Sequence, residues 1–368
     1  MSFENLDLID ELLKAVDELG FVEPTPIQTD AIPEIIGGDR DLVGLAQTGT
    51  GKTAAFGLPM IQLIDFDLTH PQGVVICPTR ELSLQISDDI KKLCKYVRGA
   101  KVAAVYGGAS IENQRNQIKK GVQIIVATPG RLLDLINRKI AKLSKVSYVV
   151  LDEADEMLNM GFQEDIDAIL ANTPSQKRTW LFSATMPNEV AKISKRYMEN
   201  PVEITVGKKN SGADNILHVN YIVNEKDRYQ ALKRIIDYYP DIYGLVFCRT
   251  RKDTQEIAEK LIKDSYNAEA LHGDLSQAVR DKVMSRFKTK SIQVLIATDV
   301  AARGIDVQDI THVINYKLPD EAGNYTHRSG RTARAGRSGT SIAIINAREK
   351  SKLQFIERKA GVKFDYAK

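Results

Sequence analysis

The sequence predicts an α/β protein of two tandem domains, each with a mostly parallel sheet covered by helices on both faces. The chain has 368 residues, of which 43% are hydrophobic, and this is enough for two compact cores. Apolar runs of strand length alternate with helical stretches, as expected for parallel sheets buried between helices. The alternation stops once, where apolar residues vanish and turn formers gather, and then restarts. We therefore predict domains over 1–206 and 216–368, joined by a linker over 207–215.

The expected elements follow from hydrophobic spacing along each half. Leu6, Ile9, Leu13 and Val16 recur at helical spacing, so an amphipathic helix is expected that ends at Gly20, and a second helix follows Pro24–Pro26. The strands expected in the first domain are Leu42–Ala46, Gly73–Cys77, Val102–Tyr106, Gln123–Thr128, Tyr148–Asp152 and Thr179–Ser183. Those expected in the second are His218–Val223, Leu245–Cys248, Ala268–His272, Gln293–Thr298, His312–Tyr316 and Thr340–Ile345.

Charge is divided unevenly between the two halves, although the whole chain carries only +3. Residues 1–206 contain 22 Lys and Arg against 28 Asp and Glu, a net charge of −6, and residues 207–368 contain 29 against 20, a net charge of +9. Opposite signs favour closure of one half on the other, and they place phosphate contacts mainly on the second half.

The cysteines and the N-terminus indicate where the protein works. Cys77, Cys94 and Cys248 have no metal-like spacing, and they fit buried thiols in a reducing compartment. The first residues are acidic where a signal peptide is basic, and no apolar run approaches about 18 residues. We therefore expect a soluble, cytoplasmic protein without a membrane partner.

A phosphate-binding loop is predicted between Asp41 and Thr53, where a short apolar strand meets a glycine-containing turn and then Lys52. Glycines let backbone N–H groups approach phosphate oxygens, and the following helix N-terminus adds partial positive charge. Lys52 can reach the outer phosphates, and the Thr53 hydroxyl can ligate Mg²⁺. Ala46 replaces the first glycine of the usual pattern, yet a chance match to the relaxed pattern is expected only about 0.03 times in such a chain. The nucleotide contacts expected from the loop are Gln47, Thr48, Gly49, Thr50, Gly51, Lys52 and Thr53.

A pair of carboxylates follows the predicted strand that ends at Asp152. In open α/β sheets, ligands bind at the carboxyl ends of the strands. Asp152 can hold Mg²⁺ there, while Glu153 orients or deprotonates an attacking water. The alternative is a solvated acidic turn that starts the next helix, and the neighbouring phosphate loop argues against it.

Further short motifs follow in a fixed order along nearly the whole chain. They are Gly20-Phe21 with Pro24–Gln28, Pro78–Leu82, Gly107-Gly108, Thr128–Arg131, Asp152–Asp155, Ser183–Thr185, Phe247–Thr250, His272–Asp274, Thr298 through Asp306, and His327–Arg334. Together with the phosphate loop, they resemble the DEAD-box ATP-dependent RNA helicases of helicase superfamily 2. The resemblance implies two RecA-like domains, ATP and Mg²⁺ as cofactors, and RNA as a partner.

The segment ahead of the phosphate loop resembles the adenine-reading motif of that family. The Gln28 amide can donate to and accept from the N6/N7 edge of adenine, and Phe21 can stack on the ring. Thr25 belongs to the same motif, and Phe3 lies upstream where the family carries an aromatic residue. ATP should therefore be preferred over GTP. The resemblance further implies that Asp306 contacts the ribose.

Two arginines near the end of the last motif are candidate arginine fingers. Arg331 and Arg334 lie three apart, so on a helix both would project from one face toward the γ-phosphate. The alternative is a solvated basic stripe that also includes Arg328 and Arg337, or direct RNA contacts. A chance match to the motif is expected about 10⁻⁴ times, which favours the finger interpretation. Ala333 stands where the family commonly has glycine, and a positive φ there would strain alanine.

The family resemblance also implies coupling and RNA contacts. His327 would couple Asp155 and Ser183, with Thr185 in the same motif, between the two domains. Arginine and hydroxyl side chains and exposed backbone N–H groups suit sequence-independent binding of an RNA backbone. The expected RNA contacts are Arg80, Gly108, Thr128, Arg131, Arg249, Gly273 and Thr298. The isolated histidines His70, His218 and His312 have no partners at metal spacing, so core or surface roles are expected.

The leading functional hypothesis is an enzyme in which ATP and RNA jointly close two domains, bend one RNA strand and separate a short duplex. A second hypothesis is an ATP-dependent RNA clamp whose hydrolysis only times release, and a more distant one is a DNA translocase. Glu153, Arg331 and Arg334 favour turnover but do not distinguish strand separation from clamping. No basic tail or added domain is evident, so a partner protein is expected to select the RNA.

Overall fold

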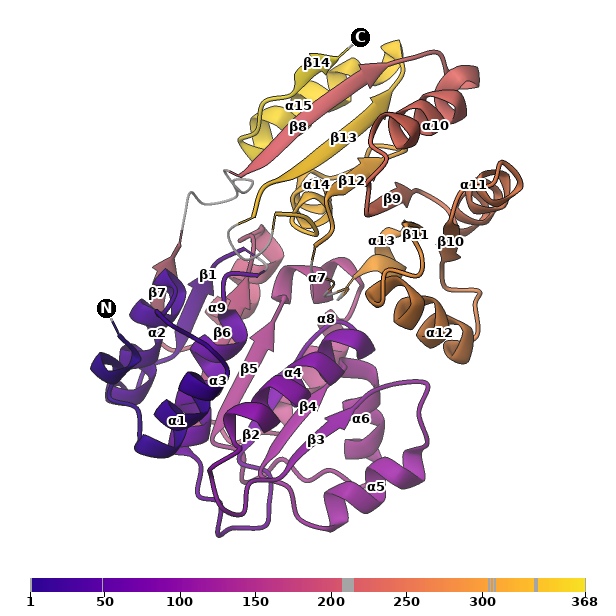
Figure 1. Cartoon of the computed structure of the whole chain (residues 1–368). Helices are drawn as coiled ribbons and strands as arrows, with labels where there is room; N and C mark the ends of the chain where they lie inside the picture. The colour runs from indigo at the N-terminus through magenta and orange to yellow at the C-terminus, as the bar shows by residue number, and fades with distance from the viewer. Residues whose placement is uncertain are drawn as a thin grey trace. The chain divides into compact units, whose positions relative to one another are not determined.

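The computed structural model describes residues 2–47, 49–206, 215–303, 305, 307, 309–333 and 337–367. The chain divides into two compact units, Met1–Lys209 and Asn210–Lys368, and each contains one seven-stranded sheet (Figure 1). All recorded strand pairs are parallel, so the predicted α/β class with two sheets is confirmed. Most of the predicted linker, 207–214, lies outside the described residues, and its bounds stay a prediction.

The first sheet has the strand order β3-β4-β2-β5-β6-β1-β7. Its inner strands are continuous apolar runs because both faces are covered, and β1, β2 and β4 are buried along their whole length. The edge strand β7 was not predicted, since only one of its four residues is buried. The strands are β1 (Leu42–Leu45), β2 (Gly73–Ile76), β3 (Val102–Val105), β4 (Ile124–Ala127), β5 (Tyr148–Asp152), β6 (Arg178–Ser183) and β7 (Val202–Thr205).

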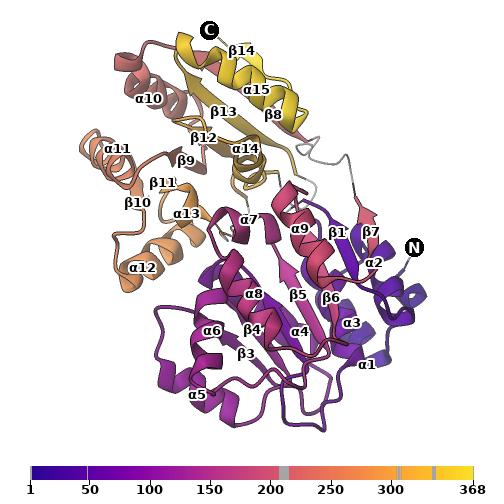
Figure 2. The same cartoon turned by 180° about the vertical axis from the view of Figure 1, so that it is seen from behind.

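Helices cover the two faces of this sheet in sequence order. One core contains side chains from α1 (Asp10–Glu18), α2 (Pro26–Gly37), α3 (Lys52–Leu63) and α4 (Arg80–Leu93). The other contains side chains from α5 (Ile111–Lys119), α6 (Pro129–Asn137), α7 (Ala154–Asn159), α8 (Gln163–Ala171) and α9 (Asn188–Tyr197). Figure 1 looks onto the side of α3 and α4, and Figure 2 onto the side of α8 and α9. Successive side chains along each strand therefore point alternately into two separate cores.

The opening helix is shorter than the sequence pattern predicts. A 3-10 turn, η1 (Phe3–Leu6), precedes α1, and Asp7 between them has a left-handed φ of 54° that interrupts the helix. Leu6 and Val16 are still buried, whereas Ile9 is 40% exposed. The prediction of one helix starting at Leu6 was therefore wrong, because hydrophobic spacing continues through a backbone break.

The second sheet repeats the arrangement with the order β10-β11-β9-β12-β13-β8-β14. Its last strand, β14, was not predicted, because it is only three residues long and mostly exposed. The strands are β8 (Ile216–Ile222), β9 (Gly244–Cys248), β10 (Ala268–Leu271), β11 (Val294–Thr298), β12 (His312–Asn315), β13 (Gly339–Ile345) and β14 (Asp365–Ala367). On one face lie α10 (Arg228–Tyr238) and α11 (Arg251–Lys263), and on the other α12 (Gln277–Lys288), α13 (Asp299–Ala302), α14 (Ala322–Ser329) and α15 (Lys350–Ala360). Two 3-10 turns, η2 (Glu225–Asp227) and η3 (Ala347–Glu349), precede α10 and α15.

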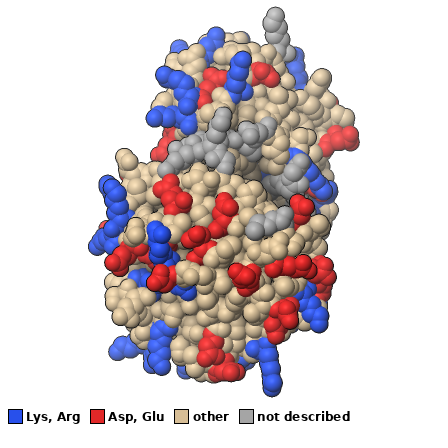
Figure 3. Space-filling view, turned by 90° about the vertical axis from the view of Figure 1, so that its left-hand side faces the viewer, with Lys and Arg blue, Asp and Glu red and all other residues tan. Residues whose placement is uncertain are grey.

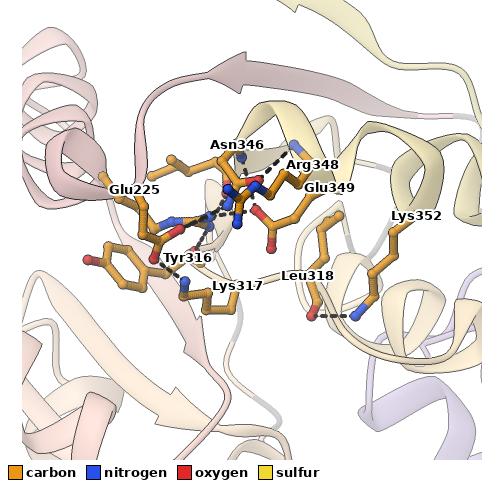
Figure 4. A network of polar contacts seen from close by, with 10 residues as sticks. Glu225, Tyr316, Lys317, Leu318, Asn346, Arg348, Glu349 and Lys352 are labelled. Carbon is orange, nitrogen blue, oxygen red and sulfur yellow. Dashed lines mark hydrogen bonds and ion pairs between the residues drawn. The ribbon is translucent and has the colours of Figure 1, made fainter.

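A buried arginine joins the start of α10 to the carboxyl ends of β12 and β13. The Arg228 side chain is 1% exposed and donates to the backbone oxygens of Tyr316 at 2.7 Å and Ile344 at 2.5 Å. It also pairs with Glu225 at 2.8 Å and with Glu349 at 2.5 Å. Figure 4 shows Glu225 and Glu349 entering the same network of polar contacts from two segments. The Nη1 and Nη2 atoms of the buried guanidinium have acceptors, which offsets much of the cost of burying the charge, whereas its buried Nε has no hydrogen-bond partner among the described residues.

Glu225 should therefore contribute a pH-dependent part of the stability. Burial acts to raise its pKa, but hydrogen bonds from Lys317, Asn346 and Arg228 outweigh burial and lower the pKa from 4.5 to about 2. Because the folded pKa is the lower one, the stabilisation is present above pH 4.5 and is lost as the pH falls toward 2. Glu225→Gln should lower the free energy of unfolding at neutral pH by about 1 kcal/mol, since the half-exposed side chain is partly screened.

Urea unfolding at several pH values measures this difference between wild type and Glu225→Gln. The difference should shrink between about pH 5 and about pH 3. Glu256→Gln is the matched control, because its ion pair with Lys252 is long, at 3.8 Å, and exposed. That control should change the free energy of unfolding by less than about 0.5 kcal/mol. A difference for Glu225→Gln that does not vary with pH would contradict the ionic origin of the stabilisation.

The structure can be compared with the predicted charge of the first domain and with the predicted burial of the cysteines. Figure 3 shows acidic side chains scattered across the first domain on the side drawn there, in keeping with its net charge of −6. Cys77, Cys94 and Cys248 are all buried and free, which confirms the predicted buried thiols. Among the described residues, no helix is both long and apolar enough to cross a membrane.

Candidate nucleotide and RNA sites

The order of strands in the first sheet separates the predicted nucleotide residues from the predicted RNA residues. All pairs are parallel, so the carboxyl ends of the strands lie at one edge. The phosphate loop follows β1, the acidic pair ends β5, and Ser183 ends β6, and these three strands are neighbours. Arg80, Gly108 and Thr128 follow β2, β3 and β4, which are neighbours on the other side. One edge of one sheet therefore carries both candidate sites.

The phosphate loop has the backbone geometry that glycine permits. Gly49 and Gly51 have φ of 84° and 88°, in the left-handed region that favours glycine. Gly51 is the N-cap of α3, so Lys52 and Thr53 open the helix whose N-terminus faces the loop. Lys52 is 6% exposed, and its Nζ donates to the Ala46 oxygen at 3.0 Å. Thr50 donates to the Gln47 oxygen at 2.7 Å, and Thr48 lies outside the described residues.

Gln28 connects the predicted adenine-reading segment to the phosphate loop. Its Nε2 donates to the Gly51 oxygen at 3.0 Å, and its Oε1 accepts from the Thr25 N–H at 3.0 Å. A Cβ on Gly51 would lie 2.4 Å from Gln28 Nε2, so a larger residue there would have to displace the Gln28 amide from this contact. Gln28 is 3% exposed, whereas Phe21 is 40% exposed and lies 6.2 Å from the buried ring of Phe3. The structure thus brings Thr25 and Gln28 to the loop and leaves Phe21 accessible for stacking.

The acidic pair lies buried at the end of β5. Asp152 is 3% exposed, and burial raises its pKa to about 6, with Glu153 and Asp155 acting in the same direction and Lys52 against them. The Asp152 carboxylate accepts from the Glu153 N–H at 3.0 Å. Glu153 has a left-handed φ of 51° at the start of α7. A buried carboxylate beside a lysine and other carboxylates is well suited to hold a cation. The alternative interpretation of the acidic pair as a solvated turn is therefore wrong for Asp152.

Three of the four predicted coupling residues meet within the first domain. The Asp155 carboxylate accepts from the backbone N–H of Thr185 at 2.9 Å and from the Thr185 hydroxyl. The Ser183 hydroxyl accepts from the Asp155 N–H at 3.4 Å. The end of β6 is thereby tied to the helix that follows the acidic pair. His327, the fourth, lies on α14 of the second domain.

The RNA candidates of the first domain cluster around the loop after β3. The Arg80 guanidinium lies over the Tyr106 ring, 4.9 Å from its centroid. Arg131 donates to the Ala109 oxygen at 3.1 Å, and Gly108 has a φ of 78°. Thr128 is half-buried and is the N-cap of α6. Arg80 and Arg131 are thus held on either side of one glycine-containing loop.

Gln114 is a residue of this cluster that the sequence analysis missed. It is 4% exposed on α5, its Nε2 donates to the Tyr106 oxygen at 3.0 Å, and its Oε1 accepts from Arg131 at 3.1 Å. One amide therefore fixes both the loop and one of the arginines. The available signal was weak, because Gln114 and Arg115 are both polar residues on the helix face between Ile111 and Ile118.

Gln114→Leu should weaken RNA binding by about fivefold to tenfold, because two buried hydrogen bonds that position the cluster are lost. The KM for ATP without RNA should stay within about twofold, since the nucleotide residues follow other strands. Titration of RNA into an ATPase assay measures both quantities. Gln117→Leu, an exposed glutamine on the same helix, is the matched control. Equal effects of the two variants would exclude a positioning role for Gln114.

In the second domain the RNA candidates also follow three neighbouring strands. Arg249 follows β9, Gly273 follows β10, and Thr298 ends β11, and these strands form one end of the sheet. Arg249 pairs with Asp320, and the Thr298 hydroxyl caps α13 by accepting from the Ala301 N–H at 3.4 Å. The second domain thus presents the same pattern of loops as the first.

The arginines of the last motif are mostly buried, so the alternative of a solvated stripe is wrong for Arg328 and Arg331. Arg328 is 3% exposed and pairs with Asp299 through two nitrogens, with 2.6 Å for the Nη2 to Oδ2 distance. Arg331 is 4% exposed and donates to the backbone oxygens of Ile305 at 3.1 Å and His327 at 3.2 Å. Arg331 lies past the end of α14, which Gly330 caps. The helical spacing assumed for Arg331 and Arg334 therefore does not determine where the Arg331 side chain points.

Ala333 and Arg334 also belong to the last motif, and Asp306 ends the motif before it. Ala333 has a φ of 57°, so the condition stated for strain at this alanine, a positive φ, is met. This conformation costs a residue with a Cβ about 1–2 kcal/mol. Arg334 and Asp306 lie outside the described residues.

The isolated histidines have core or surface environments. His218 is buried against Tyr325, and His312 lies 4.3 Å from the Tyr239 ring centroid. Burial lowers the pKa of both to about 4, so they are neutral at physiological pH. His70 is half-buried and lies near the Pro71 oxygen. Within the described ranges, no group of three or more His, Cys, Asp or Glu residues could hold a metal ion.

The fold and the loop geometry define the class of the protein: a P-loop nucleoside triphosphatase with two RecA-like domains. Residues 25–193 match the family model for the DEAD/DEAH box helicase, and residues 227–336 match that for the helicase conserved C-terminal domain. The chain is 46% identical over 364 residues to the DEAD-box ATP-dependent RNA helicase CshA of Bacillus cereus, covering 99% of this chain and 69% of the relative. The chain belongs to the DEAD-box ATP-dependent RNA helicases, which are RNA-dependent ATPases.

Solved structures agree with this assignment. The structure of S. cerevisiae Dbp5 bound to RNA and ADP BeF3 matches with a TM-score of 0.92 at 30% identity, covering 100% of this chain and 95% of that chain. A Dbp5 variant bound to a Gle1 variant and IP6 matches with a TM-score of 0.81, also at 30% identity, covering 100% of this chain and 94% of that one. The predicted RecA-like fold is confirmed.

Proposed function

We propose that the protein hydrolyses ATP in response to RNA and uses domain closure to bend one RNA strand and separate short duplexes. The observation that carries this proposal is the single carboxyl edge of the first sheet. Its β1, β5 and β6 ends hold the phosphate loop and the acidic pair, and its β2, β3 and β4 ends hold the RNA candidates. We expect ligands at these neighbouring loops to influence each other's binding. Opposite net charges of the two halves support closure.

In this proposal, residues of the first domain bind the nucleotide and activate the attacking water. Gln28 reads adenine, the loop N–H groups and Lys52 hold the phosphates, and Glu153 orients and deprotonates water. Mg²⁺ bound by the Thr53 hydroxyl and Asp152 would neutralise phosphate charge. The buried, lysine-facing Asp152 fits this role, because Mg²⁺ takes one or two carboxylates and completes its shell with water and phosphate.

The second domain supplies the groups that complete the reaction. Arg331 and Arg334 stabilise charge on the γ-phosphate, Asp306 contacts the ribose, and His327 couples to Asp155, Ser183 and Thr185. Arg249, Gly273 and Thr298 continue the RNA path, which binds backbone and carries no sequence. We also propose a cytoplasmic location, where three buried thiols stay reduced. We further propose that a partner protein selects the RNA, and the structure of the Dbp5 variant bound to a Gle1 variant shows that a relative binds a protein partner.

A gel assay of strand release tests the proposal directly. A short labelled RNA duplex should be separated with ATP, and multiple turnovers should fail with a nonhydrolysable analogue. An RNA clamp would instead bind RNA in an ATP-dependent manner without releasing the strand. Comparing RNA with DNA as activators of hydrolysis addresses a DNA translocase, and equal stimulation by both would contradict the proposal.

A further inference from the structure

A groove in the second domain lies away from the candidate RNA residues of that domain. Its volume is about 770 Å³, within the range of roughly 300–1,000 Å³ found for ligand sites. The groove runs between α10 and β14, with β8 contributing to its floor. In the sheet order, β8 and β14 stand at one end and β10, β11 and β9 at the other. The groove is therefore at the opposite end of the sheet from Arg249, Gly273 and Thr298.

The groove has an apolar floor and aromatic walls. Val219 and Ile235 on the floor are 8% and 5% exposed. Four tyrosines line it: Tyr221, Tyr238, Tyr239 and Tyr366, of which Tyr238 and Tyr366 are 74% and 62% exposed. The rings of Tyr238 and Tyr239 meet edge to face at 4.8 Å. Burial raises the pKa of Tyr221, and the neighbouring phenols of Tyr239 and Tyr238 add to this. Several phenols thus share one small space.

The rim of the groove carries more negative than positive charge. Asp227 and Asp365 line it from α10's start and from β14, against the single guanidinium of Arg234. A nucleic-acid strand would bring phosphates to two carboxylates, so this rim disfavours RNA. A ligand with a positive charge would complement the rim. An apolar floor with a polar rim is also the usual anatomy of a protein interface.

The groove borders the free edge of the sheet, and its tyrosines indicate the class of ligand. β14 pairs with β8 on one side and is the last strand of the sheet, so no strand of the described chain lies beyond it. Rigid tyrosine rings are the surfaces that bind proline-rich segments, whose extended helix loses little entropy on binding. We propose that this tyrosine groove binds an extended, proline-containing peptide segment of a partner protein, with a lysine or arginine placed at the acidic rim.

The test uses the full chain and a fluorescein-labelled probe, a twelve-residue peptide of proline-rich repeats with one arginine. A second peptide has glutamate in place of that arginine. Fluorescence anisotropy should show saturable binding of the first peptide, and binding of the second should be at least about tenfold weaker. Tyr238→Ala should weaken the first peptide by about tenfold, as expected for an exposed aromatic anchor. Phe355→Ala is the matched control, since Phe355 is 41% exposed on α15 across the sheet.

Each other outcome would overturn the proposal. The first is absence of saturable binding up to about 1 mM protein, the weakest affinity that counts as specific here. The second is equal binding of the two peptides, and the third is an equal effect of Phe355→Ala. Single-stranded RNA binding that Tyr238→Ala abolishes would assign the groove to nucleic acid. Sedimentation showing a dimer that Tyr238→Ala dissociates would assign it to a second copy of the chain. ATPase activity of Tyr238→Ala should stay at the wild-type value, so the result is independent of the proposed function.

Discussion

Arg331→Ala should lower RNA-stimulated ATP turnover by about 10³–10⁵-fold while changing ATP affinity far less. A guanidinium supplied to the γ-phosphate stabilises charge that develops in the transition state, and fingers of this kind account for such factors. Lysine should rescue poorly, because an ammonium keeps the charge but loses the planar fork. Single-turnover hydrolysis and nucleotide titration of the same variants separate the two quantities.

The burial of Arg331 sets the controls for that experiment. Because its guanidinium donates to the backbone oxygens of Ile305 and His327, thermal unfolding must show that the second domain remains folded in the variant. Arg337→Ala is the matched control, since that side chain is 64% exposed in the same segment. If normal turnover returned at saturating RNA, with weaker and more salt-sensitive RNA affinity, Arg331 would be an RNA contact instead.

Glu153→Gln should stop the chemical step and leave ATP binding intact. Glutamine has the same shape and keeps the backbone N–H that donates to Asp152, but it no longer accepts a proton from water. Hydrolysis should fall by about 10²–10⁴-fold, the usual contribution of general base catalysis. The variant should remain trapped with ATP on RNA, which native gels with labelled RNA measure.

Glu164→Gln makes the same chemical change on an exposed residue of α8 and should hydrolyse ATP normally. The two carboxylates of the acidic pair can also be distinguished by this experiment. If Glu153→Gln failed to bind ATP, the division between a metal-holding Asp152 and a water-activating Glu153 would be wrong.

The sequence predicted the two sheets and most of the candidate site because both depend on local patterns. Buried parallel strands are unbroken apolar runs, and glycines with positive φ mark the phosphate loop at Gly49 and Gly51. The same reasoning applies to Ala333. A position where the family commonly has glycine can mark a positive φ, so strain at an alanine there could be considered from the sequence. The edge strands β7 and β14 escaped detection because exposure on an edge removes the apolar signal.

Features that depend on distant partners were not accessible from the sequence. Arg328 looked like part of a basic stripe, but its acceptors on Asp299, Asn315 and Lys317 lie 11 to 29 residues away. Gln114 was missed for the same reason, because its partners Tyr106 and Arg131 come from two other segments. Only the fold reveals whether a polar side chain has met its acceptors or remains in water.

The pairing of β2 with β5 has a mechanical consequence for the first domain. These two strands carry the Arg80 loop and the acidic pair, and they are hydrogen-bonded to each other in register from Gly73 and Tyr148 onward. Adjacent strands lie about 4.8 Å apart, so a signal between the two ligands crosses a single ladder of peptide groups. Communication over such a span needs no relay through the protein interior. If RNA binds at the Arg80 loop as proposed, a shift of the Pro78–Arg80 backbone would alter the alignment of β2 against β5 and so reach Asp152 through one pair of neighbouring strands.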